Sequence, residues 1–350
     1  MKRLFAFLLA FSFLLLTMTS CGKDKTKTEN NGNGDYVSAA ESSDLVIPYS
    51  REDGINPYKA TSLMNQCVMP LLYQSLYTLT ASYEATPTLA SKAVFSGKKL
   101  TLTLNNNTAF SDGTFLNASD VVYSFNLAKA SAYYGTGLSQ FSSIRADSGN
   151  TVTLTMTDVN LYATALLTFP IVKSGTATDN TSIPVGSGPY TYSKAESGGL
   201  LSLKKGESGK AKQVYLLNVT DSGSLLSSLA IGNVDLVFDD ISDGTLTRVD
   251  NAKKVQADLN QLLYIGIHER ISGLSDPEVR LSLSAVLNRT DLISTGVDGY
   301  GTPATLPFNP KFYALEGLKV TEKNKAEAGK LLEETFRGET LTILTDADNA

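Results

Sequence analysis

The chain has 350 residues, of which 30 are basic and 35 acidic, and its formal net charge is −5. A mildly acidic chain without a basic cluster is a poor nucleic-acid binder, so we expect no nucleic-acid partner. A chain of this length exceeds one ordinary domain, and two lobes are the expected minimum.

The first twenty residues have the layout of an export signal. Lys2 and Arg3 precede an apolar run over residues 4–16, and small or polar residues then lead to Cys21. The run is shorter than the ~20 apolar residues that cross a bilayer as a helix. The stretch resembles a bacterial lipoprotein signal, which implies that cleavage leaves Cys21 as a new N-terminus carrying acyl chains. The alternative is ordinary secretion, with Cys21 discarded or left as a free thiol.

A polar tether is predicted after the signal. Residues 22–35 read GKDKTKTENNGNGD and contain no large apolar side chain. Such a segment cannot bury enough surface to offset its chain entropy, so we expect disorder over residues 21–35. No later segment approaches ~18 consecutive apolar residues, and the protein is expected to sit on the membrane through its lipid. Cys67 lies in an apolar stretch and is predicted to be a small buried hydrophobe.

Strands and helices both appear in the first half of the folded part. The predicted strands cover 43–49, 100–104 and 151–157. The predicted helices run from a cap at Thr61 or Ser62 to Leu76, from a cap at Ser119 or Asp120 to Leu127, and over 161–169. Strict alternation of apolar and polar residues indicates the later strands, and apolar residues at helical spacing indicate the helices.

A Gly- and Pro-containing stretch over 186–189, which interrupts regular secondary structure, precedes the second half. The predicted strands are 190–192, 200–203, 213–219, 234–238, 262–267 and 340–344. The predicted helices are 222–230, 276–287 and 322–336. Because helices accompany both alternating and fully apolar strands, the pattern predicts an α/β architecture with mixed sheets and more than one lobe.

Several segments carry a family resemblance. Residues 110–125, FSDGTFLNASDVVYSF, combine a turn, a helix cap and an apolar triplet at fixed offsets. This stretch resembles the signature of the family 5 extracellular solute-binding proteins, which serve peptide and nickel importers of the ATP-binding cassette (ABC) type. Other segments that match in the family's order include YQSLY at 73–77, PTLAS at 87–91, GSGPY at 186–190 and DPEVRLSLSAVLNRTD at 276–291.

The resemblance implies a two-lobed periplasmic-binding-protein-like α/β fold of class II, with mixed sheets and an extra small subdomain. The implied domains are a signal peptide over 1–20, the tether over 21–35, a first lobe over 36–65 and 181–260, a small subdomain over 66–180 inserted in that lobe, and the start of a second lobe over 261–350. Family members usually continue further. The sequence is therefore interpreted as C-terminally clipped, with the second large lobe incomplete.

Candidate ligand-binding residues follow the first strand and lie among the tyrosines. Tyr49 and Arg51 come at the strand's end, where a cleft edge is expected, and Arg51 would pair a ligand carboxylate. The alternative for Arg51 is a solvated loop side chain. Tyr133 and Tyr134 would offer an aromatic platform to peptides, or else pack at a rim. Tyr190 is the remaining candidate, on a predicted strand.

Enzymatic chemistry finds little support in the sequence. His268 is the only histidine, whereas an HExxH zinc site needs two and a Ser-His-Asp triad would need this one. Neither a nucleophile elbow nor a phosphate or dinucleotide loop occurs. Asp239, Asp240 and Asp243 would bind calcium or, as we favour, form a solvated turn. We therefore predict no enzyme, no metal site and no cofactor.

The function implied by the resemblance is capture of a solute between hinged lobes and its delivery to an importer. The expected partners are a peptide ligand, ABC permease subunits and the membrane through the lipid, with the protein a monomer at the extracytoplasmic face of the cell membrane. Oligopeptides or dipeptides are the favoured ligands. The alternatives are a nickel chelate or another small solute, a sensory or interaction lipoprotein without transport, and a surface hydrolase.

Overall fold

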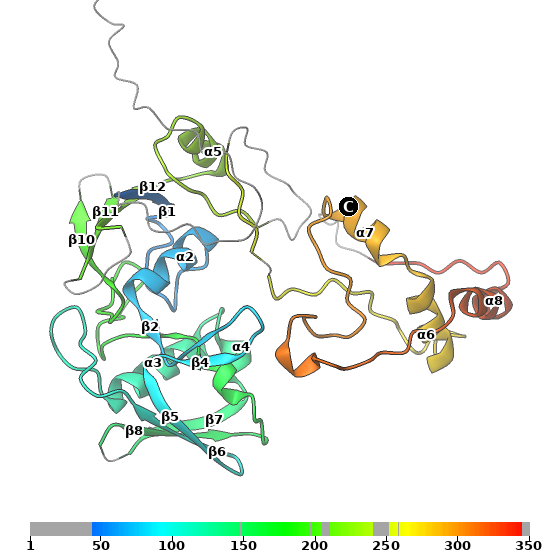
Figure 1. The fold of residues 1–350 in the computed structure, drawn as a ribbon, viewed down its shortest axis with the longest axis horizontal. Helices are drawn as coiled ribbons and strands as arrows, with labels where there is room; N and C mark the ends of the chain where they lie inside the picture. Colours follow the sequence, from blue (N-terminus) through cyan, green and yellow to red (C-terminus); the bar gives the residue numbers. More distant parts are fainter. Residues whose placement is uncertain are drawn as a thin grey trace, which may run out of the picture. The chain divides into compact units, whose positions relative to one another are not determined.

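The computed structural model describes the part of the chain that follows the predicted tether (Figure 1). The described residues are 44–147, 149–195, 198–204, 211–240, 252–257 and 259–344. The predicted signal, Cys21, the tether and Asp243 lie outside them. No described helix is long and apolar enough to cross a membrane.

The first four-stranded sheet has the strand order β1–β12–β11–β10. Its strands are β1 (Leu45–Tyr49), β10 (Tyr190–Ala195), β11 (Gly198–Leu203) and β12 (Gln213–Asn218). β1 runs parallel to β12, and the other pairs are antiparallel, so the sheet is mixed as predicted. The buried side chains of Ile47, Leu201 and Leu216 anchor it in the core.

The outer edge of β1 is closed without a further strand. The Val46 N–H donates to Asp235 Oδ2 at 2.7 Å, and the Asp235 N–H donates to the Val46 carbonyl at 2.8 Å. Pro48 has no N–H to offer at this edge. The predicted strand over 234–238 is therefore wrong, because the Asp235 carboxylate takes the place that a neighbouring strand's carbonyl would fill.

The second four-stranded sheet is antiparallel throughout, with the order β5–β6–β8–β7. Its strands are β5 (Ala90–Ser96), β6 (Lys99–Leu104), β7 (Phe141–Ala146) and β8 (Thr151–Met156). The predicted alternation is confirmed, since Leu100, Leu102 and Leu104 are buried. Helix α3 (Ala118–Ala130) packs on β7 and β8, with Phe125 edge-on to Phe141 at 5.9 Å between ring centroids.

The N-cap of helix α3 lies two residues before Ser119 and three before Asp120, the predicted caps. Its N-cap is Asn117, whose side chain accepts from the Ser119 N–H at 2.8 Å. Asp120, the third helical residue, accepts from the Asn117 N–H at 3.0 Å, which completes a capping box. Three of the four residues from Asn117 to Asp120 are polar and could cap the helix. The reciprocal hydrogen bonds between Asn117 and Asp120 identify Asn117 as the cap.

Helix α2 (Leu63–Leu72) starts at the predicted cap Ser62 but ends before Leu76. Tyr73 is extended, and the Gly188 N–H binds the Leu72 carbonyl at 2.8 Å, so the approach of the 186–189 segment stops the helix. Short strands follow it. They are β2 (Gln74–Ser75), paired with β9 (Pro170–Ile171), and β3 (Tyr77–Leu79), paired with β4 (Ala85–Pro87).

The predicted helices over 222–230, 276–287 and 322–336 are present as α5 (Ser222–Ala230), α6 (Pro277–Val286) and α8 (Lys325–Phe336). The helices α4 (Gly135–Leu138) and α7 (Arg289–Gly296) were not predicted. The predicted helix over 161–169 is reduced to the 3₁₀ turn η1 (Ala163–Leu166). Pro170 was predicted only to end this helix. It also belongs to β9, which pairs with β2, and this pairing holds the preceding residues near that two-stranded sheet.

Helices α6 and α8 enclose a second, smaller core. Leu274, Val279 and Phe336 form this cluster, apart from the large core under the two sheets. The strands predicted over 262–267 and 340–344 are absent from the described residues. Leu263 is 70% exposed there and Ile343 69%, and an apolar run without a neighbouring strand has no ladder to join.

Residues 303–320 form a long segment that returns to the β3–β4 turn. Phe312 and Tyr313, at the start of the turn η2 (Tyr313–Leu315), stack edge-on with Tyr162 at 5.5 and 6.2 Å. The Tyr313 N–H donates to the Ser82 carbonyl at 3.0 Å, and Asn309 Nδ2 donates to the Tyr83 hydroxyl at 2.7 Å. We call these contacts the aromatic latch.

Candidate ligand-binding site

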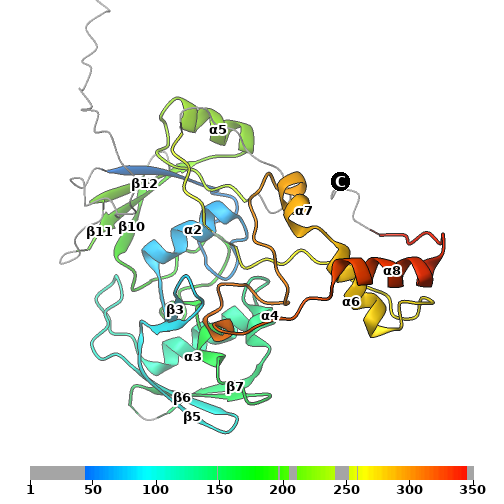
Figure 2. The ribbon, with the colours of Figure 1, turned by 45° about the vertical axis from the view of Figure 1, so that its right-hand side comes forward.

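The candidate site lies where the parallel strands β1 and β12 end (Figure 2). Tyr49 closes β1 opposite Asn218, the last residue of β12. In α/β sheets, ligands bind in the crevice outside the carboxyl ends of parallel strands. Arg51 follows β1 at this edge, and Asp221, the N-cap of α5, follows β12. The strand ends therefore bring together residues far apart in the sequence.

The side chains of Tyr49 and Arg51 contact each other. The sequence indicated only that the two residues lie close along the chain. The Tyr49 ring is buried, whereas Arg51 is exposed. Arg51 Nε lies 3.5 Å from the Tyr49 hydroxyl, at the outer limit of a hydrogen bond, and this interaction raises the pKa of Arg51. The Arg51 backbone N–H donates to Asn218 Oδ1 at 2.8 Å, which joins the loop to β12.

Tyr192 belongs to this group, although sequence analysis did not select it. Burial raises the pKa of Tyr192, the neighbouring Tyr49 raises it further, and Arg51 opposes the rise. The three side chains therefore interact electrostatically. Glycines of β11 make room for the rings, because a Cβ on Gly199 would lie 2.5 Å from Tyr192 Cε2 and one on Gly198 3.2 Å from Tyr49 Cε1.

A buried asparagine fixes the loop that carries Arg51. Asn65 of α2 is fully buried, and its amide oxygen accepts from the Ser50 N–H at 2.7 Å. Its amide nitrogen donates to the Ser50 carbonyl at 2.7 Å and also to the Gly54 carbonyl. Both backbone groups of Ser50 are thus satisfied by one side chain, and Arg51 leaves a rigid point. An apolar helix pattern gives no signal for this role.

Asp53 holds the far end of the same loop. Its carboxylate accepts from the backbone N–H groups and hydroxyls of Thr61 and Ser62 at 2.8 to 3.1 Å. Burial by itself raises the pKa of Asp53, but these hydrogen bonds outweigh it and leave the pKa below its ordinary value. The loop from β1 to α2 is therefore tied at both ends.

A cavity of about 230 Å³ adjoins this group beside β10. Its lining residues are Leu72, Ser111, Asp112, Ile183, Pro184, Val185, Gly186, Tyr190, Thr191 and Tyr192. Asp112 is the charged residue of the lining, and it pairs with Lys173 at 2.5 Å. Hydrogen bonds from Lys173 and Thr114 hold the pKa of Asp112 well below its usual range. The buried Tyr190 donates its hydroxyl to the Ala211 carbonyl at 2.7 Å.

The remaining sequence candidates form a separate pair. Tyr133 and Tyr134 meet edge-on, with ring centroids 4.8 Å apart, at the start of α4. Tyr133 is 65% exposed, whereas Tyr134 packs against the large core, where burial raises its pKa. Within the described residues, the hydrogen bonds and ring contacts of this pair do not include Tyr49 or Arg51.

The residues considered for metal or thiol chemistry are scattered. His268 is exposed, and its Nδ1 accepts from the Arg270 N–H at 3.2 Å. Asp239 and Asp240 are exposed, and the described part of the chain holds no cluster of three or more metal-ligating side chains. Cys67 is only half-buried, and its partial burial raises the thiol pKa.

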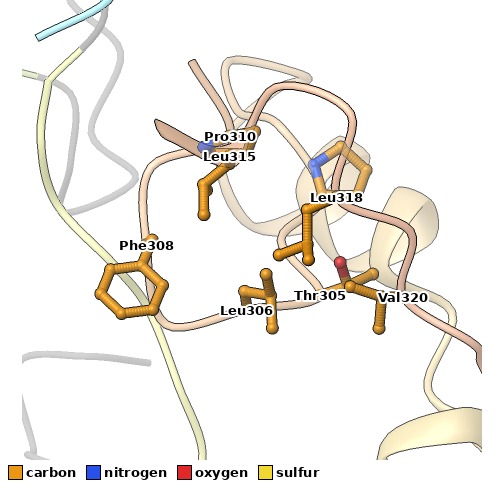
Figure 3. A pocket seen from close by; sticks show the side chains of 8 residues that line it. Thr305, Leu306, Phe308, Pro310, Leu315, Leu318 and Val320 are labelled. Atoms are coloured by element: carbon orange, nitrogen blue, oxygen red, sulfur yellow. The ribbon is translucent and has the colours of Figure 1, made fainter. Parts of the chain in front are cut away.

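A second, smaller cavity of about 160 Å³ lies within residues 303–320 (Figure 3). Leu306, Leu315, Leu318 and Val320 gather there, with Phe308 at the margin and no charged residue in the lining. Because the cavity is formed by one segment of chain, we assign it to the local packing of that segment.

Solved structures similar to this chain define its class. MppA, a periplasmic murein tripeptide-binding protein in its unliganded open form, aligns with a TM-score of 0.63 and 17% identity over 86% of this chain and 66% of that one. NikA from Brucella suis, in complex with Fe(III)-EDTA, aligns with a TM-score of 0.59 and 18% identity over 84% and 64%. The fold is that of the periplasmic binding proteins, and the predicted fold class is confirmed.

The family follows from the sequence match. Residues 84–346 match the model of the bacterial extracellular solute-binding proteins, family 5 middle region. The chain belongs to this family, whose members are non-enzymatic components of transporters.

Curated relatives are longer than this chain. Oligopeptide-binding protein AppA of Bacillus subtilis (strain 168) is 25% identical over 241 residues, which are 63% of this chain and 44% of AppA. Glutathione-binding protein GsiB of Escherichia coli (strain K12) is 24% identical over 302 residues, which are 80% of this chain and 59% of GsiB. The chain thus spans about half the length of these relatives.

Proposed function

We propose that this protein is the extracytoplasmic solute-binding component of an ABC importer and that it captures oligopeptides or dipeptides. The observation that carries the proposal is the family match over residues 84–346. Relatives named for oligopeptide and glutathione binding support a peptide ligand. The importer's permease subunits would receive the loaded protein.

The proposed mechanism is closure of lobes around the ligand. We assign residues 36–65 and 181–260 to a first lobe, 66–180 to the inserted subdomain and 261–350 to the start of a second lobe. Separate four-stranded sheets in the first two parts and the second core in the last support this division. A ligand that contacts both lobes favours the closed state by its differential affinity, and the importer would recognise that state.

The proposed ligand contacts begin with Tyr49 and Arg51 at the strand ends. Tyr190 contributes through the lining of the adjoining cavity, and Tyr133 and Tyr134 are assigned to a rim. Aromatic surfaces suit varied peptides because they offer contact area at low entropic cost. Support for this group is its position at the carboxyl ends of the parallel strands.

Anchoring through a lipid on Cys21 completes the proposal, with the folded part a monomer held at the outer face of the cell membrane. The support is the layout of residues 1–21. Replacing Cys21 with alanine should release the protein from the membrane fraction into the soluble envelope fraction or the medium. Mass spectrometry of the N-terminal peptide should find acyl chains on the wild type. An unmodified cysteine on membrane-associated protein would contradict anchoring by this route.

Capture of a nickel chelate or another small solute is the second candidate, favoured by the alignment with NikA. Native mass spectrometry of the full-length mature protein, isolated with its co-purified ligand, separates the two. Peptides support the first proposal, and a metal-bearing species supports the second. Both proposals would be contradicted if the protein is isolated empty and neither a peptide library nor a nickel chelate raises its melting temperature.

A further inference from the structure

Arg51 is a cation that no carboxylate of the described residues neutralises. The ion pairs among those residues involve other side chains, such as Arg145 with Asp147 and Lys173 with Asp112. Asp53, two residues away, is occupied by Thr61 and Ser62. The one side-chain partner described for Arg51 is the hydroxyl of Tyr49, reached through Nε. Among the described residues, the terminal nitrogens of the guanidinium therefore have no side-chain partner.

The backbone at Arg51 is fixed before any ligand arrives. Its backbone N–H is bound to Asn218 at 2.8 Å, and the preceding Ser50 is held on both sides by Asn65. The ring of Tyr49 is buried and its hydroxyl is 3.5 Å from Arg51 Nε, and the charge of Arg51 acts on the pKa of Tyr192. With the backbone fixed, only the side-chain torsions of Arg51 have to be ordered when a ligand binds, and its planar fork matches two oxygens of one anion.

We infer that Arg51, at the ends of β1 and β12, is the carboxylate anchor, the residue of the binding site that binds a carboxylate of the ligand. The protein would then select ligands that carry a free carboxylate. The inference rests on the proposed function and narrows it. The two terminal nitrogens of Arg51 would donate in parallel to the carboxylate oxygens, while Tyr49 and Tyr192 contact the adjoining part of the ligand. A peptide offers such a group at its C-terminus or on an acidic side chain.

The test compares peptides with and without that charge. A mixed library of tri- to pentapeptides in free-acid form, and the same library as C-terminal amides, is titrated calorimetrically against the full-length mature protein. Arg51→Gln should weaken binding of the free acids at least tenfold and leave amides without aspartate or glutamate unchanged, while Arg51→Lys recovers part of the loss. Arg145→Gln is the matched control, because Arg145 is 68% exposed, already paired with Asp147 and remote in sequence. It should change neither library.

Other outcomes separate the possible failures. If Arg51→Gln binds every carboxylate-bearing peptide as wild type does, or weakens amides without aspartate or glutamate just as much, the anchor is refuted while the proposed function stands. If the discriminating peptides are those with aspartate or glutamate inside an amidated chain, the anchor holds a side-chain carboxylate. If the wild type binds inorganic phosphate but no peptide, both the anchor and the proposed function are wrong. Equal melting temperatures of Arg51→Gln and wild type exclude a folding defect.

Discussion

Asp53 shows how one side chain stabilises the loop beside the candidate site. Its carboxylate satisfies the N–H groups of Thr61 and Ser62 just before α2, which would otherwise need water. The hydrogen bonds favour the charged form, so the folded state binds its proton more weakly than the unfolded chain does. The loop is therefore coupled to pH through a group that does not touch the proposed ligand.

Asp53 should make stability depend on acidity. Because its folded pKa is lowered, its contribution is present above the unfolded value of about 3.9 and is lost as the pH falls through the folded value. Asp53→Asn should lower the free energy of unfolding by about 1 kcal/mol at pH 7. The gap to wild type should be constant down to about pH 5 and narrow below pH 4. Urea unfolding at each pH measures it.

The control for Asp53 is Asp158→Asn, which replaces a side chain that is 93% exposed and in a surface ion pair with Lys98. Surface pairs contribute little, so this variant should follow the wild type at every pH. A gap for Asp53→Asn that stays constant down to pH 3 would show that the carboxylate charge does not stabilise the loop.

Gly188 should tolerate no side chain. A Cβ at this position would lie 2.4 Å from the Leu72 carbonyl carbon and 2.6 Å from the Tyr73 nitrogen, both of which are backbone atoms. Gly188→Ala should therefore cost about 3 kcal/mol or more in unfolding free energy, because the end of α2 must move. Gly137→Ala is the control, since its Cβ would meet only Leu166 Cδ2 at 3.7 Å. Denaturant midpoints within error of each other would contradict this account.

At the residue scale, the sequence indicated candidate residues for the proposed site but not the contacts that support them. Tyr49 and Arg51 follow directly from the end of an apolar strand. Asn218 and Tyr192 meet them from more than 140 residues away, and no local pattern predicts that meeting. Asn65 lies within an apolar helix stretch, where a polar residue looks like a solvent-facing one. Its burial is explained only by the backbone of Ser50 across the loop.

The aromatic latch is the element-scale feature that connects the 303–320 segment to the β3–β4 turn. Tyr83 has a left-handed backbone, with φ at 62°, a conformation that tyrosine adopts at some cost. The turn bonds from Thr80 to Glu84 and the Asn309 bond to the Tyr83 hydroxyl hold it there. The latch therefore joins a ring cluster to a strained turn.

Removing the rings should loosen the segment as a unit. Tyr162→Ala and Phe312→Ala should each speed hydrogen exchange at the Tyr313 amide, which is bonded to Ser82. The double variant should fall short of the sum by about 0.5–1.5 kcal/mol, because the two rings stack on each other. Phe308→Ala is the control, since this half-exposed ring takes part in none of the latch contacts. Additive effects would show that the rings do not act together.

Elements were predictable where the signal is local. Strict alternation identified β6 and β8, and a cap followed by proline identified α6. The strands predicted over 234–238 and 262–267, and the alternating stretch over 340–344, are absent from the described residues, because a strand also needs a neighbour with free backbone groups. The helix predicted over 161–169 is absent for a related reason. Pro170 pairs with β2, and this pairing keeps the residues before it from continuing as a helix.

The described residues form two cores of unequal size. The large one extends under both sheets, while Leu274, Val279 and Phe336 form the small one between α6 and α8. A small cluster buries little apolar surface, so this region should open at a lower free energy than the sheets. The family and the fold class were recognisable from motifs along the chain, but the separation of the cores depends on distant packing.

Phe336→Ala should destabilise the small core selectively. Loss of this ring should lower the opening free energy of α6 and α8 by about 3 kcal/mol or more, up to the stability of that region. Hydrogen exchange in β6 and β8 should be unchanged. Val152→Ala, in the buried face of β8, is the matched variant and should have the opposite pattern. If either variant loosened both regions equally, the chain would unfold as one cooperative unit.

The closed margin of β1 has a consequence for the behaviour of the protein in concentrated solution. With Asp235 and Pro48 occupying that side, strand addition by another molecule cannot begin there. Within the described residues, β10 is the opposite margin of that sheet, and Lys194 is its charged, solvent-facing side chain. Repulsion between lysines on approaching copies would then oppose strand addition at this second margin of the sheet.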